Sequence, residues 1–171
     1  MKALQTIWAG MIRLLEIVTI ALFAVLVLDV LWGVISRYMP GIKPSDWTEE
    51  LAVYLLVWVS LLASALTFRE HGHLGVDYFV SKFDPSARRL AGFVAEISVL
   101  VFSVVALLWG GWRLVVDTLS ADQLTPVLQW KIGYLYSVVP ITGVFFTISA
   151  IEHLVALARR GADGEAAAHD A

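Results

Sequence analysis

The sequence predicts an all-α integral membrane protein with four transmembrane helices, and two observations support this fold class. Of the 171 residues, 59% are hydrophobic and only 16% are charged, and the mean hydropathy is +0.78. A soluble domain usually has about 45–50% apolar and about 25% charged residues, so the excess predicts lipid-facing surface and excludes a soluble enzyme. The chain also has four apolar stretches long enough to cross about 30 Å of hydrocarbon. They run over residues 14–36, 48–68, 90–116 and 134–156.

These stretches leave almost no room for a soluble domain. Residues 1–156 are expected to form one membrane domain, and residues 157–171 a small, acidic, flexible tail. The first apolar run is too long for a cleaved signal peptide, and no small-residue cleavage site follows it. The formal charge of -3 provides no basic field for nucleic acid. The chain has no cysteine, which excludes disulfides and thiolate chemistry, and no cofactor is predicted.

Basic residues predict the orientation of the spans, because cytoplasmic loops carry an excess of Lys and Arg. Eight basic residues precede the first span, follow the second or follow the fourth, whereas four lie in the other two connections. Both termini and the middle connection are therefore expected in the cytoplasm. The eight are Lys2, Arg13, Arg69, Lys82, Arg88, Arg89, Arg159 and Arg160, and the four are Arg37, Lys43, Arg113 and Lys131.

Aromatic residues gather towards the predicted external side. One interpretation is an interfacial belt, because amphipathic rings favour the headgroup level. The other is a docking surface, because Trp and Tyr also anchor protein interfaces; the belt is favoured because it needs no partner. The residues are Trp32, Tyr38, Trp47, Trp109, Trp112, Trp130 and Tyr134.

The first connection ends with acidic residues at the start of the second span. Asp46 followed by Glu49 resembles a capping box, and carboxylates there suit the positive end of the helix dipole. Glu49 and Glu50 are adjacent and point about 100° apart on a helix. They are therefore a poor match to a paired-carboxylate catalyst, and capping is the favoured interpretation.

The middle connection offers two further features. His71, His73 and Asp77 could chelate a metal, but flanking glycines leave the backbone unfixed, so structural histidines are favoured. Apolar residues then recur at helical spacing over residues 76–83, and Pro85 follows. This pattern predicts a short amphipathic helix between the second and third spans, lying in the cytoplasmic interface or packing against a partner.

Charges inside a span are costly and are functional candidates by default. Asp29 is the deepest, about four residues past the middle of the first span. No basic residue of the chain lies at its depth, so we predict a hydroxyl, a Trp N–H or a partner subunit as its contact. On this basis Asp29→Ala should loosen subunit assembly more than membrane insertion. Three glutamates near the cytoplasmic span ends are expected to be solvated or paired with arginine: Glu16, Glu96 and Glu152.

The sequence lacks the pair of broken half-helices that marks a midplane substrate site. Within the predicted spans, proline occurs only at Pro140, where neighbouring helices can absorb a kink. Four helices with one deep charge are more typical of a structural component than of a self-sufficient transporter.

Several motifs together resemble one family: the small permease (Q, or DctQ-like) subunit of tripartite ATP-independent periplasmic (TRAP) transporters. The family has W-[ST]-E-E-L at the start of the second helix and R-x-x-x-H-[IL]-x-[VI]-D after it, and residues 47–51 and 69–77 follow both patterns. The resemblance covers about residues 10–155, with departures at Val127 and Lys131. With Asp29, the matching positions are the candidates for partner contact. They are Arg37, Trp47, Glu49, Glu50, Trp58, Arg69, His73, Asp77, Pro126, Tyr136 and Pro140.

The resemblance implies a subunit of the bacterial inner membrane without chemistry of its own. In such systems a periplasmic binding protein captures an organic acid, and a large multi-helix subunit carries it inward on a sodium gradient. The small subunit packs along the large one as a scaffold, and its external surface is a candidate docking site for the binding protein. Substrate and sodium sites belong to the large subunit.

Two other classes of membrane protein share some of these features. A small multidrug-type exporter also has four short helices and acts as a homodimer, but it has a glutamate in mid-span, whereas Glu16 lies at a helix end. A haem-binding membrane anchor needs histidines stacked inside the spans. His71 and His73 lie outside the spans, and His153 lies near an edge.

Overall fold

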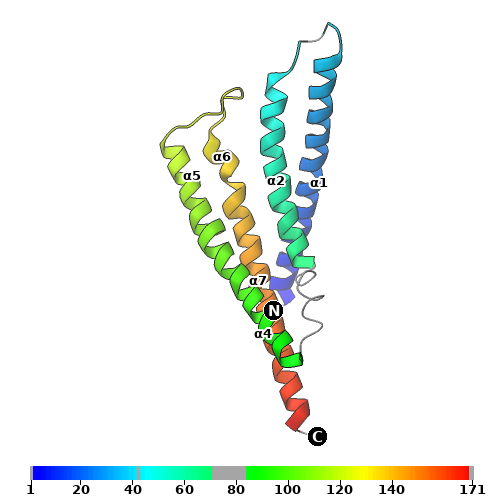
Figure 1. The fold of residues 1–171 in the computed structure, drawn as a ribbon, viewed down its shortest axis with the longest axis vertical. Coiled ribbons are helices and arrows are strands. Elements are labelled where there is room, and N and C mark those ends of the chain that lie inside the picture. The colour runs from blue at the N-terminus through cyan, green and yellow to red at the C-terminus, as the bar shows by residue number, and fades with distance from the viewer. Residues whose placement is uncertain (1, 42, 71–83, 170–171) are drawn as a thin grey trace.

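The computed structural model describes residues 2–41, 43–70 and 84–169. In this part of the chain, four helices are long and apolar enough to cross a membrane (Figure 1). Each predicted stretch lies inside one of them, so the prediction of four apolar helices long enough to cross a membrane is confirmed. The four are Trp8–Tyr38, Asp46–Glu70, Leu90–Ser120 and Ile132–Ala158.

The first two spans form an antiparallel hairpin of α1 (Lys2–Tyr38) and α2 (Asp46–Glu70). One stripe of α1 is buried or half-buried at alternating spacings of three and four residues, the repeat of a coiled-coil seam. The stripe is mostly apolar, but it also contains two hydroxyl side chains that bond back to their own helix and the deep carboxylate. Its buried members are Ile12, Leu15, Thr19, Leu26, Asp29 and Ser36.

The third span is built from α4 (Pro85–Phe102), a π-helical segment η1 (Ser103–Gly110) and α5 (Gly111–Ser120). The fourth is built from α6 (Ile132–Tyr136) and α7 (Val138–His169). A π-helix is rare and is seldom longer than one turn. Here α7 packs closely against it, because Gly143 has no side chain at the contact.

The two hairpins meet where α2 packs on α7, and they diverge towards the end that carries the first and third inter-span loops (Figure 1). Leu62 and Ala65 of α2 pack against Val138 of the second hairpin in the buried core. Stacked rings close the opposite end, where the Phe68 and Phe146 centroids lie 5.0 Å apart.

Little of each span is covered by the rest of the chain. Between 11% and 28% of the residues in each apolar window are buried inside the molecule. The remaining apolar surface must therefore face lipid or another protein, since water would be a poor solvent for it.

The short amphipathic helix predicted over residues 76–83 lies outside the described residues. The same holds for His71, His73 and Asp77. Helix α7 continues to His169, so it extends beyond residue 156, where the predicted fourth span ends.

Candidate interface at the loop end of the helices

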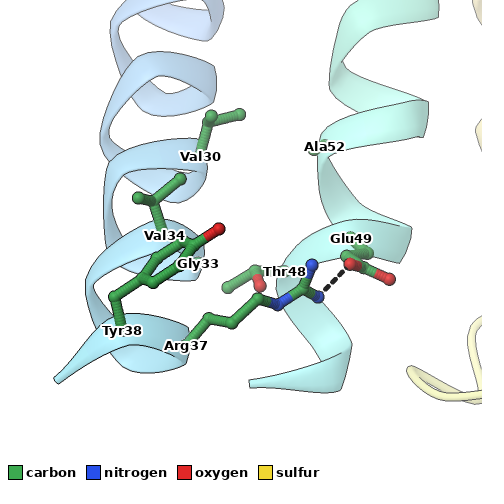
Figure 2. Close-up of a pocket in the computed structure, with 8 residues that line it drawn as sticks. All are labelled: Val30, Gly33, Val34, Arg37, Tyr38, Thr48, Glu49 and Ala52. Carbon is green, nitrogen blue, oxygen red and sulfur yellow. Dashed lines mark hydrogen bonds and ion pairs between the residues drawn. The ribbon is translucent and has the colours of Figure 1, made fainter. Parts of the chain in front are cut away.

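An ion pair crosses the first hairpin near its loop. The Arg37 guanidinium at the end of α1 contacts the Glu49 carboxylate in the first turn of α2 (Figure 2). Both side chains are more than half exposed. One turn before Arg37 on α1, Gly33 lets α1 approach α2 closely, because a Cβ there would lie 2.9 Å from the Thr48 hydroxyl.

Glu50 points to a different partner from its neighbour. Its Oε2 accepts hydrogen bonds from the backbone N–H groups of Val127, at 3.0 Å, and Leu128, at 2.8 Å. Both residues belong to the loop between α5 and α6, and the tip of this loop points towards the start of α2 (Figure 1). The divergence of the two glutamates agrees with the predicted angle. Glu49 reaches α1, and Glu50 reaches a distant loop of the same chain.

The loop that Glu50 holds, residues 121–131, has its own hydrogen-bond framework. The Thr125 N–H donates to the Trp130 carbonyl at 2.8 Å, and the Trp130 N–H donates to the Thr125 hydroxyl at 3.0 Å. Lys131 forms an ion pair with Asp122 at 2.9 Å, and this hydrogen bond raises the pKa of the lysine. The loop therefore presents Pro126, exposed at its tip, from a defined scaffold.

Trp58 ties α2 to the start of the fourth span. Its indole N–H donates to the Leu135 carbonyl at 2.8 Å. The helix is interrupted at Ser137, between Tyr136 at the end of α6 and Pro140 in the first turn of α7. The Trp58 indole therefore bonds to a carbonyl in α6, just before this interruption.

Asp29 is 6% exposed and lies on the stripe of α1 that faces α2. Among the described residues, neither of its carboxylate oxygens has a hydrogen-bond partner. The intramolecular hydroxyl or Trp N–H that the sequence suggested is therefore not seen in this part of the chain. Arg113 pairs with Asp117 at 3.7 Å and lies over the Trp109 ring.

The other candidates are distributed along the molecule. Trp47 is 42% exposed beside the first loop. At the opposite end, the Arg69 guanidinium lies 5.8 Å from the Trp8 ring. Glu96, expected beside arginine, is buried, and its Oε1 lies 3.2 Å from His153 Nδ1.

We predict that Glu50→Ala loosens the loop whereas Glu49→Ala does not. The first change removes the acceptor of two backbone N–H groups and should cost about 2 kcal/mol of unfolding free energy. The second removes an exposed ion pair, which is screened by solvent and contributes little to stability. Trypsin cleavage after Lys131, the basic residue of the loop, measures the loosening. Equal cleavage rates in the two variants would contradict the assigned role of Glu50.

Comparison with known proteins adds independent evidence. Residues 26–160 match the family model for tripartite ATP-independent periplasmic transporters, DctQ component. The chain is 26% identical over 144 residues to a Haemophilus influenzae protein named as a TRAP transporter small permease, covering 84% of this chain and 86% of that protein. It is 27% identical over 139 residues to the sialic acid TRAP transporter small permease protein SiaQ of Vibrio cholerae, covering 81% and 78%.

A third relative is much longer. The chain is 22% identical over 152 residues to the isethionate TRAP transporter permease protein DctMQ of Oleidesulfovibrio alaskensis. The match covers 88% of this chain but only 22% of that protein. Similarity is thus confined to one part of a larger permease polypeptide.

Proposed function

Because this chain belongs to the DctQ family of TRAP transporter small permease subunits, we propose that it braces the large transport subunit in the bilayer and has no substrate site of its own. The chain is a multi-pass membrane protein of a bacterial transport system and not an enzyme. Its family implies a tripartite complex with a large permease and a binding protein.

One observation carries the proposed bracing role. Polar residues of the family motifs engage other parts of the same chain: Arg37 with Glu49, Glu50 with the 121–131 loop, and Trp58 with Leu135. The first contact joins the two helices of the first hairpin, and the other two tie the first hairpin to the second. All three leave most of each span's apolar surface uncovered. Membrane helices associate by packing and polar contacts, so a rigid, apolar pair of hairpins suits a fixed support.

The proposal includes an orientation and a class of cargo. Both termini face the cytoplasm and the two loops face outward, as the distribution of basic residues favours. The cargo is an organic acid, carried inward by the large subunit on an ion gradient. This class is supported by relatives named for sialic acid, isethionate and C4-dicarboxylate.

Purification of the tagged chain in mild detergent from its native host tests the proposal. We expect a large polytopic membrane protein to accompany it in about equal amount, identified by mass spectrometry. A chain that emerges alone as a stable homodimer, with proton-coupled export activity, would overturn the proposal in favour of the exporter.

We predict that Trp47→Ala weakens engagement of the binding protein, because an exposed tryptophan beside the loops is a suitable docking anchor. In vesicles containing the complex, the binding-protein concentration for half-maximal uptake should rise about tenfold. Trp109→Ala, at a tryptophan that is more exposed than Trp47 but lies on the other hairpin, is the control. Unchanged uptake at every binding-protein concentration would leave Trp47 with a belt role only.

A further inference from the structure

A groove runs along the seam of α1 and α2 at their loop end. It has a volume of about 290 Å³ and is lined by residues of these two helices (Figure 2). Gly33 forms part of its floor, where the absent side chain and the nearby Thr48 bring the helices together. The deeper part is apolar, with Val30, Val34 and Ala52 along its walls.

Two opposite charges stand at the mouth of the groove. Arg37 reaches across from α1 to Glu49 on α2 (Figure 2). The hydrogen bond between them uses one guanidinium nitrogen and one carboxylate oxygen, Oε1. A guanidinium has five N–H donors and a carboxylate has a second oxygen, so each partner keeps capacity to bind another group.

This mouth lies at the level of the membrane–water interface. Tyr38 and Asp46 are the end residues of the first two spans, and Arg37 and Glu49 lie within one turn of them. Tyr38 is 80% exposed beside the groove, as expected for a ring at the headgroup level. The apolar part therefore extends from the headgroups towards the bilayer centre.

We propose that the groove binds a phospholipid with a primary-amine headgroup, such as phosphatidylethanolamine. The phosphate contacts Arg37, the ammonium donates to Glu49, and one acyl chain lies along Val30, Val34 and Ala52. Because Arg37 and Glu49 carry zero net charge together, the mouth complements a zwitterionic headgroup better than an anionic one. A quaternary amine has no N–H to donate, so the carboxylate favours the primary amine over choline.

A protein helix fits the groove less well than a lipid. A helix with its side chains is about 10–12 Å across, and a volume of about 290 Å³ admits one side chain or one acyl chain but not a helix. The binding of lipid here goes beyond the bracing role, and it requires only that this end of the helices lie at a bilayer surface.

Photolabelling of the intact complex tests the inference. The complex is reconstituted in vesicles of equal parts phosphatidylethanolamine and phosphatidylglycerol, with a photoreactive acyl chain on a trace of one lipid at a time. Peptide mapping then measures labelling of residues 30–38 and 48–52. We expect the amine lipid to label these residues about two- to fivefold more than the glycerol lipid, the factor that an exposed ion pair supplies.

Two variants with matched controls sharpen the test. Glu49→Gln should abolish the preference for the amine lipid, whereas Asp117→Asn, which breaks an equally exposed ion pair elsewhere, should leave it unchanged. Val34→Trp should fill the groove and lower labelling by both lipids, whereas Val27→Trp, exposed on α1 outside the groove lining, should not. Equal labelling by the two lipids in the native complex, no labelling of these residues, or a preference that survives Glu49→Gln would overturn the inference.

Discussion

Replacing Gly143 with alanine is expected to destabilise the chain by about 1–3 kcal/mol, and replacement with valine by more. A Cβ on Gly143 would lie 2.9 Å from the Leu107 Cβ, 3.0 Å from the Leu108 nitrogen and 3.1 Å from the Leu107 carbonyl carbon. Two of these three atoms are main chain, so no side-chain rotation relieves the clash. The variant must therefore push α7 away from η1.

Gly92 is the control for this change. It lies on α4, which also packs on α7, but a Cβ there would meet Leu157 methyl groups at 3.8 and 3.9 Å, an ordinary contact. Gly92→Ala should thus leave stability unchanged or raise it by less than about 1 kcal/mol, through helix propensity. Unfolding in mixed SDS micelles, followed by circular dichroism, compares the two. Equal effects would show that the contact between Gly143 and η1 is not tight.

Asp29→Leu is expected to stabilise the chain while weakening its association with the large subunit. A buried polar group left without a hydrogen-bond partner costs about 1–3 kcal/mol, and more if it is charged. Removing the carboxylate is therefore expected to raise the free energy of unfolding by about 2–3 kcal/mol. A buried carboxylate without a partner among the described residues is costly to the fold, and a costly intramembrane charge is a functional candidate.

Two measurements separate the fold from the assembly. Unfolding in SDS micelles reports the stability of the chain, and the amount of large subunit recovered with the tagged chain reports association. Thr19→Val is the control, because Thr19 lies on the same buried stripe but its hydroxyl already bonds to the Leu15 carbonyl at 2.7 Å. Higher stability with undiminished recovery would remove the predicted partner role of Asp29.

The four spans could be predicted from the sequence because transfer into lipid is a property of each local stretch. Hydropathy over residues 48–68, for example, needs no knowledge of what the helix packs against. The direction of neighbouring side chains was equally predictable, since helical geometry separates Glu49 from Glu50. Resemblance to the family marked Trp58, Tyr136 and Pro140 without assigning their contacts.

The partners of these residues could not be predicted. Glu50 bonds to backbone groups 77 and 78 positions away, and every residue type except proline offers the same backbone N–H donor. The π-helical segment η1 has no internal proline that would signal it. The contact of Gly143 with that segment depends on the relative shift of two spans, which local patterns do not encode.

The division into two hairpins also sets an order for biogenesis. Residues 2–70 can pair their helices as soon as they are inserted, whereas the bonds of Glu50 need residues that are translated later. At about 5–20 residues per second, a separation of 77 residues corresponds to about 4–15 s. During this interval the face of α2 that will meet α7 is exposed to the surrounding lipid. A nascent chain thus passes through a state in which only the first hairpin has formed, and the speed of translation sets how long this state lasts.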